Sequence, residues 1–286
     1  MKQNTWTTEE LNFLKLNYPK YGVNYCVNKL GYTKSKIQNK THELKIKLLS
    51  TIKSTILSKP TTKCNINPDL FYNINSKEIS YLLGLIWADG FLNPSKNGKN
   101  HNLGFTMVKE DIDVIKPVLN TIGIWNYYER KQIVDTWKPS INVVTNNKRI
   151  FNYLVDHDYN KKSYISADKI LDKIPDELKH YFYRGLIDGD GCFYYYKPKK
   201  GSTLRQFALT STYEQDWSYF EELCVKLGIN YNIKRIKKVK SSSSVIRITN
   251  KDGINKLGDY IYNNFEKDGI GLNRKYNKLK LITNDF

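Results

Sequence analysis

The chain has 286 residues, enough for one large domain or for a large domain and a small one. Lys and Arg outnumber Asp and Glu by 46 to 28, and aromatic residues make up 13% of the sequence. The formal net charge of +18 favours a polyanionic partner, and the aromatic content favours a folded nucleic-acid binder over a short basic ribosomal or membrane-surface protein. No stretch approaches the roughly 20 apolar residues of a membrane helix, and the N-terminus lacks a signal-peptide run. We therefore expect a soluble protein with no membrane partner.

Cysteine and histidine give no sign of a metal centre or a disulfide framework. The four cysteines, Cys26, Cys64, Cys192 and Cys224, lie far apart and show no CxxC spacing. The four histidines are also scattered. The sequence therefore predicts reduced thiols, without a zinc site, a disulfide or a histidine-based triad.

Residues 1–48 predict a small all-α domain of three short helices. Thr7 and Glu10 have the spacing of a capping box, and Pro19 and Gly22 are expected to end the first helix. The second helix is expected over Asn24–Leu30. A third, capped by Thr33, is expected to run from Lys34 to Leu48.

The basic character of the third helix suggests a helix-turn-helix. In such units the last helix enters the major groove of DNA. The residues of suitable type to reach phosphates and base edges are Lys34, Lys36, Gln38, Asn39 and Lys40. A helical cap with a solvated charged face is the alternative. Residues 49–74, rich in Ser, Thr, Lys and Pro, are predicted to be a linker.

The rest of the chain contains an internal duplication. The segments YLLGLIWADGF from Tyr81 and YFYRGLIDGDGCF from Tyr181 are similar, and their aspartates Asp89 and Asp190 lie 101 positions apart. After each segment the periodicity predicts strand, strand, helix, strand, strand and helix. We therefore expect two equivalent halves, residues 75–172 and 173–286.

Small residues recur four positions apart in both segments, which on a helix puts them on one face. Two such helices can pack until their backbones nearly touch. The aspartates then meet at the helix ends, each followed by a glycine suited to a left-handed cap. The small residues are Gly84 and Ala88 in the first segment and Gly185 and Gly189 in the second, and the cap glycines are Gly90 and Gly191.

Two carboxylates at the negative ends of adjacent helices repel each other and require a positive partner. A divalent metal is the simplest partner: Mg²⁺, with Mn²⁺ as a substitute, binds one or two carboxylates together with water and phosphate oxygens. Such metals activate water and stabilise the leaving oxygen in phosphodiester hydrolysis. The alternative is that Asp-Gly is only a common turn dipeptide. Its occurrence at both helix ends favours the metal site.

The phrases LLGLIWADG and YRGLIDGDG resemble the signature helices of the LAGLIDADG family, and the similarity extends over about residues 75–282. The resemblance implies an α+β fold of two αββαββα halves that pack through these helices, each with a curved sheet for the DNA major groove. It also implies Asp89 and Asp190 as catalytic metal ligands, with the preceding Ala88 and Gly189 in the metal site. Trp87 stands where the second copy has Asp188, but this earlier acidic position is not a ligand in the family.

A second repeated phrase, Asn160–Tyr164 and Asn273–Tyr276, contains basic residues. By resemblance, such residues approach the cleavage centre, which makes Lys162 and Lys275 candidate catalytic residues. Lys161 and Arg274 are close behind. Ordinary phosphate-contacting or solvated lysines remain the alternative.

The hairpins of each half are expected to read DNA. The stretches Ile233–Lys238 and Ile246–Thr249 are predicted to place basic or polar side chains on one face of a sheet and apolar ones on the other. Arg and Lys suit guanine, whereas Asn and Gln suit adenine. Together with Lys161 and Arg274, the candidate DNA-binding residues are Arg130, Gln132, Asn142, Arg205, Lys234, Arg235, Lys237, Lys238 and Arg247.

The resemblance implies a site-specific homing endonuclease that cuts both strands of a long double-stranded DNA target, and we expect a monomer. The start at Met and the end in TNDF predict a free-standing protein, not an intein. The excess of Lys over Arg is typical of an AT-rich genome, so we expect the cytoplasm of a bacterial or phage-infected host, or an organelle matrix. An RNA-binding intron maturase and a non-cutting transcription regulator are the alternatives. The presence of both aspartates favours cutting.

Overall fold

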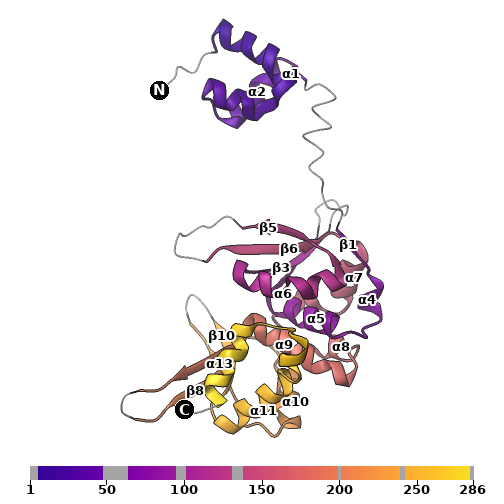
Figure 1. Ribbon diagram of the computed structural model, residues 1–286, viewed down its shortest axis with the longest axis vertical. Coiled ribbons are helices and arrows are strands. Elements are labelled where there is room, and N and C mark those ends of the chain that lie inside the picture. The colour runs from indigo at the N-terminus through magenta and orange to yellow at the C-terminus, as the bar shows by residue number, and fades with distance from the viewer. Residues whose placement is uncertain are drawn as a thin grey trace. The chain divides into compact units, whose positions relative to one another are not determined.

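A computed structural model describes residues 6–47, 64–94, 101–130, 138–198, 201–238 and 242–283. The chain divides into two compact units, Met1–Lys63 and Cys64–Phe286 (Figure 1). Each unit is described by itself. The candidate Gln132 and residues 48–63 lie outside the described part of the chain.

The first unit is helical, as predicted. Helix α1 (Thr8–Leu30) begins with the predicted capping box and is broken at Gly22, whose φ of 74° and ψ of −175° are not helical. Pro19 lies inside the first segment and does not end it. Gly31 adopts the left-handed conformation after the second segment, with a φ of 68°.

Helix α2 (Lys34–Glu43) is the third helical segment and is capped by Thr33, which accepts from the amide of Lys36 at 3.3 Å. It ends earlier than the predicted Leu48, because Lys45 has a positive φ of 54°. The core of the unit consists of the buried side chains Leu14, Cys26, Tyr32 and Ile37.

The second unit contains two copies of one element order (Figure 1). The first copy comprises α5 (Lys77–Asp89), β2 (Gly90–Asn93), β3 (Asn102–Val108), α6 (Lys109–Ile122), β5 (Asn126–Glu129), β6 (Ser140–Thr145) and α7 (Lys148–Asp156). The second comprises α9 (Lys179–Asp190), β7 (Cys192–Tyr196), β8 (Leu204–Thr212), α10 (Ser218–Lys226), β9 (Asn232–Ile236), β10 (Ser243–Ile248) and α11 (Lys251–Ile261). The predicted αββαββα duplication is confirmed.

Short elements connect and extend these copies. Strand β1 (Asn65–Ile66) pairs with β4 (Gly123–Ile124), and α4 (Asp69–Tyr72) precedes the first copy. Further short helices are η1 (Tyr159–Lys161), α8 (Asp168–Leu171), η2 (Asp176–Leu178) and α12 (Phe265–Asp268), and the last helix is α13 (Asn273–Thr283).

The predicted linker over residues 49–74 is wrong in its second part. Ile66 in β1 and Phe71 in α4 are buried in the core of the second unit. These apolar residues are too few and too irregularly spaced to show a period, so their burial depends on the tertiary contacts of the elements that follow.

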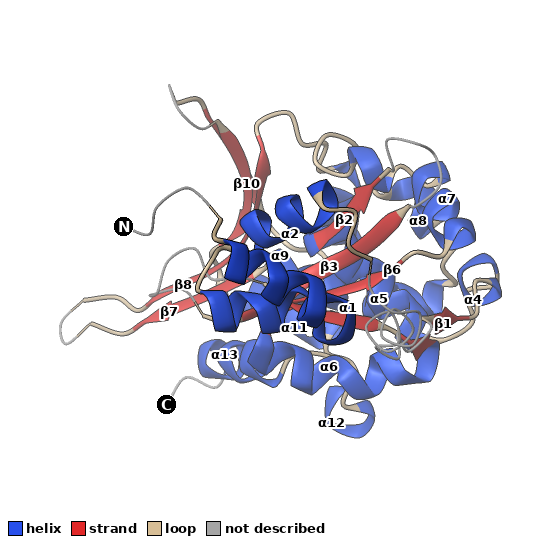
Figure 2. Cartoon of the chain, turned by 90° about the horizontal axis from the view of Figure 1, so that it is seen from above, coloured by secondary structure: helices blue, strands red, loops and turns tan. Residues whose placement is uncertain are grey.

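The two sheets have the same antiparallel topology, β2-β3-β6-β5 and β7-β8-β10-β9. Figure 2 shows β2, β3 and β6 of the first sheet and β7, β8 and β10 of the second. Phe105 pairs with Val143 on the core face of the first sheet, and Leu209 pairs with Ile246 on that of the second. All four side chains are buried. This period of two leaves the opposite face of each sheet for polar groups.

Helices α5 and α9, here called the signature helices, pack against each other along their glycines. A Cβ atom added to Gly84 would overlap the carbonyl oxygen of Phe182, and one added to Gly185 would overlap that of Tyr81. The predicted close approach is therefore confirmed, and each glycine is required by the backbone of the opposite helix. Within the described residues, no helix is long and apolar enough to cross a membrane.

Candidate active site between the two halves

Asp89 and Asp190 are the last residues of the two signature helices. A Cβ atom on Gly189 would lie 2.5 Å from the Ala88 Cβ and 3.0 Å from the Oδ2 of Asp89. The small residues thus let the two helix ends converge, so that the carboxylate of one helix contacts the backbone of the other.

The glycines after the aspartates do not form the predicted left-handed caps. Gly90 has a φ of −75° and Gly191 a φ of −71°, both in extended conformation, and both lead directly into the following strands. A side chain at Gly90 would overlap the carbonyl oxygen of Ile86, and one at Gly191 would crowd Ile187. Tight packing against the last helical turn, not a positive φ, therefore explains both glycines.

The two carboxylates lie in an unfavourable electrostatic environment. Burial raises the pKa of Asp89 to about 6, and the charge of Asp190 adds to this effect. Burial also raises the pKa of Asp190, although its side chain is the more exposed of the two. Lys162 and Lys275 oppose both shifts. The site therefore holds two carboxylates that gain from a nearby cation.

Lys162 reaches the end of α5, the signature helix of its own half. Its Nζ donates to the carbonyl oxygens of Ile86 at 3.1 Å and Ala88 at 2.5 Å. Burial lowers its pKa to about 8, against the opposing charges of Asp190 and Asp89.

Lys275, near the start of α13, occupies the equivalent place at the end of α9. Its Nζ donates to the carbonyl oxygens of Ile187, at 3.4 Å, and Gly191. Burial and the neighbouring Arg274 lower its pKa. The structure thus brings all four candidate catalytic residues to the converging helix ends.

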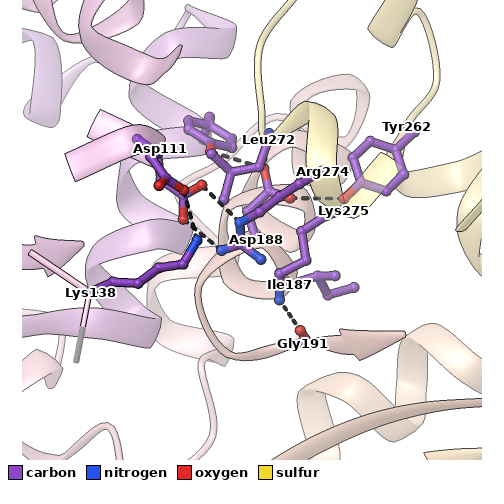
Figure 3. Close-up of polar contacts among 11 residues, drawn as sticks. Asp111, Lys138, Ile187, Asp188, Gly191, Tyr262, Leu272, Arg274 and Lys275 are labelled. Carbon is purple, nitrogen blue, oxygen red and sulfur yellow. Dashed lines mark hydrogen bonds and ion pairs between the residues drawn. The ribbon is translucent and has the colours of Figure 1, made fainter. Parts of the chain in front are cut away.

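Asp188 is fully buried, and its oxygens accept hydrogen bonds from within the protein (Figure 3). Oδ1 accepts from the hydroxyl of Tyr262 at 2.8 Å, and Oδ2 accepts from the hydroxyl of Tyr81 at 3.0 Å and the amide of Leu272 at 2.8 Å. Burial raises its pKa to about 6, while these hydrogen bonds act in the opposite direction. At the equivalent position, Trp87 packs edge-on against Tyr159.

The donor set for a metal is small. Among the described residues, no three His, Cys, Asp or Glu side chains form a metal-binding group. The carbonyl of Ala88, a predicted metal-site residue, accepts from Lys162. The two carboxylates are therefore the charged groups that a cation would meet here.

Several residues at the site escaped the sequence analysis. A small cavity beside the predicted residues Asp190 and Lys162 is also lined by Thr210, Gln215 and Tyr219, which the sequence analysis did not name. It joins the first half to β8 and α10 of the second. No local motif marks Gln215, because its place at the site depends on contacts between the two halves.

The strand pairing corrects the predicted faces of the second sheet. Arg235 lies on the core-facing side with Ile233, whereas Lys234 lies on the opposite side. Arg205 is also in register with the core face, opposite Tyr195. The prediction that the basic side chains of Ile233–Lys238 share one face is wrong, because neighbouring residues of a strand point to opposite faces.

The outer face of each sheet carries the remaining hairpin candidates. Arg247 lies on the outer face of β10, next to Asn232, and Lys234 is exposed on the same face. In the first sheet Asn142 accepts from Thr106 Oγ1 at 2.7 Å on the outer face. Arg130, Lys237 and Lys238 are exposed just beyond strand ends.

The two candidates beside the predicted catalytic lysines already have ion-pair partners. Arg274 makes a two-point ion pair with Asp111, described below. Lys161 is exposed, with its Nζ 3.8 Å from the carboxylate of Asp158.

In the first unit, three of the five predicted contact residues are exposed on α2: Lys34, Gln38 and Asn39. The Nζ of Lys36 lies 4.0 Å from the centre of the Tyr32 ring, and Lys40 pairs with Glu43 at 2.8 Å. Lys36 and Lys40 are thus engaged within the unit.

Residues 184–280 match the family model described as LAGLIDADG endonuclease. This part of the chain is thus similar to LAGLIDADG endonucleases. The matched region begins within α9 and ends in α13, so it includes Asp190 and Lys275. The predicted resemblance is confirmed.

Solved structures similar to this chain include the homing endonuclease I-WcaI bound to its DNA recognition sequence, which is 22% identical. The match covers 71% of this chain and 86% of that chain, with a TM-score of 0.48. The LAGLIDADG meganuclease I-AabMI bound to uncleaved DNA is 14% identical and covers 77% of this chain and 90% of that chain, with a TM-score of 0.49. The meganuclease I-SmaMI bound to uncleavable DNA is 14% identical and covers 73% and 90%, with a TM-score of 0.47. No curated protein matches the sequence.

Proposed function

We propose that this protein is a homing endonuclease of the LAGLIDADG family that binds a long double-stranded DNA site and hydrolyses both strands. The observation that carries the proposal is the meeting of Asp89 and Asp190 at the ends of the signature helices, each with a lysine of its own half beside it. Two equivalent acid and lysine pairs suit two equivalent reactions, one on each strand of a duplex.

Asp89 and Asp190 would hold divalent metal ions, Mg²⁺ or Mn²⁺. The fit rests on the raised pKa of both carboxyl groups, because burial, and for Asp89 also the charge of Asp190, disfavours the charged form until a cation is bound. When bound, such ions activate water and stabilise the leaving oxygen of a phosphodiester. The exposure of Asp190 leaves room on that side for water and for a phosphate oxygen.

The lysines would add positive charge where the phosphates enter. Lys162 and Lys275 are already held by helix-end carbonyls, so their ammonium groups need little reordering to contact a phosphate or its attacking water. The lowered pKa of Lys162, about 8, keeps its ammonium largely charged at neutral pH while making it a better proton donor than an ordinary lysine.

The outer sheet faces would bind the DNA. Arg247 and Lys234 in the second half and Asn142 in the first lie on these faces with the side chains that suit base edges and phosphates. The exposed Lys34, Gln38 and Asn39 of α2 would add contacts from the first unit. Because one chain supplies both aspartates, we propose that the monomer is the active species.

The test is a cleavage selection on a randomised library of double-stranded DNA with Mg²⁺. We expect the wild type to release ends at one long consensus site, with no cutting in EDTA. The variants Asp89→Asn and Asp190→Asn are expected to lose at least roughly 10³-fold in rate, the scale of losing a principal electrostatic group of an active site. Binding of the same site should persist.

Two outcomes would reject the proposal. Specific binding of DNA without cutting, under any divalent metal, would instead support a transcription regulator. Tight binding of a structured intron RNA, equal in wild type and in the Asp89→Asn and Asp190→Asn variants, would support a maturase.

A further inference from the structure

The segment that carries Lys275 is held to the opposite half of the protein by an ion pair. This contact and its counterpart in the other half are called fastenings below. Arg274 Nε donates to Asp111 Oδ1 at 2.8 Å, and its Nη2 donates to Oδ2 at 2.6 Å (Figure 3). Asp111 belongs to α6 of the first half and is only 5% exposed, whereas Arg274 belongs to α13 of the second. A two-point guanidinium–carboxylate pair fixes direction as well as distance.

The segment that carries Lys162 is fastened in the reverse direction. The amide of Asp216 donates to the carbonyl of Tyr164 at 3.1 Å, and Gln215 Nε2 donates to that of Ile165 at 3.0 Å. Thr212 Oγ1 also donates to the carbonyl of Ser163. These contacts bind the end of the first half to the β8–α10 connection of the second.

Gln215 is itself rigidly held. It is 3% exposed, its Oε1 accepts from Ser211 Oγ at 2.7 Å, and its Nε2 also donates to the carbonyl of Asp216 at 2.9 Å. The amide therefore cannot turn without losing several hydrogen bonds. It lines the cavity that also contains Lys162 and Asp190.

The two fastenings are equivalent in the duplicated fold. Asp111 lies three residues after the end of β3, and Gln215 lies three residues after the end of β8, the corresponding strand of the other half. Each half thus ends in a lysine-bearing segment. That segment is held by the opposite half just after its second strand, at the start of α6 in the first half and in the β8–α10 connection of the second. The chemistry differs: an ion pair holds Lys275, and amide and hydroxyl hydrogen bonds hold Lys162.

We propose that Asp111 and Gln215 are positioning residues, Asp111 for Lys275 through Arg274 and Gln215 for Lys162 through residues 163–165. The proposal rests on the proposed endonuclease function and assigns each positioning residue to the cleavage of one DNA strand. Because each fastening acts on one lysine, loss of either one slows cleavage of one DNA strand more than the other. The two losses affect opposite strands.

The expected size follows from geometry. Displacing a catalytic group by about 1 Å can cost up to roughly 100-fold in rate, and a released segment that still samples the correct position should lose less, roughly tenfold. Affinity for DNA should change little, because neither Asp111 nor Gln215 lies on an outer sheet face. A merely structural role would slow both strands together.

The experiment follows each strand separately, under single-turnover conditions, with the full chain and a DNA target selected by the wild type. Asp111→Asn is expected to slow one strand roughly tenfold and the other less than about threefold, so that nicked DNA accumulates. Asp111→Glu, which keeps a carboxylate for Arg274, should bring the two strand cleavage rates closer together again. Gln215→Met should accumulate DNA nicked in the other strand.

Glu110→Gln is the matched control. Glu110 precedes Asp111 and makes an exposed ion pair with Lys138 at 2.8 Å, so this variant removes a neighbouring ion pair of similar length that does not involve Arg274. Both strand rates should stay at the wild-type values. If Asp111→Asn fails to fold, Arg274→Lys keeps the charge, loses the two-point geometry and is expected to slow the same strand.

The failures are distinguishable. If the wild type cuts no DNA, the proposed function is wrong. If the wild type cuts both strands and the Asp111 and Gln215 variants slow them equally, slow the same strand, or leave both unchanged, the positioning proposal is wrong while the endonuclease assignment stands.

Discussion

The two signature helices carry equivalent aspartates on different internal supports. In α5 the side chains at two equivalent buried positions are Leu83 and Trp87, and both pack in the apolar core. In α9 the corresponding residues are Arg184 and Asp188, both buried and both hydrogen-bonded. The comparison indicates that the same arrangement of aspartate and lysine can be supported by apolar packing in one half and by buried hydrogen bonds in the other.

The polar support in the second half orders a long connection. Arg184 donates to the carbonyls of Ile261 at 2.6 Å, Asn263 at 2.6 Å and Ile270 at 2.7 Å, and lies 3.2 Å from Asp268. These partners belong to the segment that leads to Lys275. In the first half, the segment that leads to Lys162 is held by Tyr159, whose hydroxyl donates to the Leu83 carbonyl at 3.0 Å and whose ring contacts Trp87.

The largest expected effect on stability comes from removing Arg184, which disrupts the polar contacts of the second half and leaves the first half unchanged. Arg184→Leu should lower the free energy of unfolding by about 3 to 5 kcal/mol, because it leaves the buried carboxylate of Asp268 without its cation and three carbonyls without the guanidinium donor. Leu83→Met, at the equivalent position of α5, should cost less than about 1.5 kcal/mol. Urea unfolding of both variants measures the difference, and equal losses would refute the contrast between the halves.

Substitution of Gly84 and Gly185 tests whether both halves depend equally on the close contact between the signature helices. Gly84→Ala and Gly185→Ala should each cost about 3 kcal/mol, because the new Cβ meets backbone atoms of the opposite helix that cannot move aside. Gly258→Ala meets only side-chain carbons of Leu279, the nearest 2.5 Å away, and should cost less. Thermal unfolding ranks the three variants. A mild effect at one of the two signature glycines would show that the halves do not share this contact equally.

The aspartates themselves should respond to pH in metal-free protein. The folded pKa of Asp89, about 6, lies above its ordinary value near 3.9, so the folded state binds the proton more tightly than the unfolded state. Its contribution to stability is therefore present at pH 4 and lost as pH rises through 6. Asp89→Asn should stabilise the protein by about 1 to 3 kcal/mol at pH 7.5 in EDTA and by much less at pH 4.

Unfolding measured at both pH values checks this expectation. The more exposed Asp190 should give a smaller gain on substitution by Asn. A variant Asp89→Asn that is less stable than the wild type at pH 7.5 would contradict the electrostatic description of the site.

The smallest effect concerns the outer sheet faces. Arg247 lies in β10 where the equivalent residue of β6 is Val144, since both are opposite an asparagine of the edge strand, Asn232 and Asn126. Arg247→Ala should cost about 1 to 3 kcal/mol of discrimination at one base pair. Val144→Thr should leave base preference unchanged. Competition binding with single-base variants of the target measures this discrimination. A uniform loss of affinity across all targets would instead identify Arg247 as a phosphate contact.

The sequence predicted the element order of both halves because the duplication lets each copy support the interpretation of the other. It also predicted the contact at Gly84 and Gly185, because small residues four apart on a helix share one face and let a second helix approach closely. The ends of short elements and the faces of charged strands were less accessible. Arg235 and Lys234 are chemically alike, and only the register with β10 shows that they point to opposite faces.

The fastening of the lysine segments lay beyond sequence reasoning for a different reason. Arg274 and Asp111 are 163 positions apart, and Gln215 lies 50 positions from Ile165. Nothing local distinguishes these residues from solvated polar side chains. Their pairing follows from the packing of the two halves, which places the end of each half against the other half just after its second strand.

The most direct test of the central claim is the binding of Mn²⁺ to the complex of the protein with its selected DNA target, followed by electron paramagnetic resonance. We predict that wild type holds the metal and that the double variant Asp89→Asn, Asp190→Asn loses it while keeping the DNA. Glu110→Gln should bind Mn²⁺ as the wild type does. Equal Mn²⁺ binding by wild type and the double variant would contradict the claim that these two aspartates hold the catalytic metal.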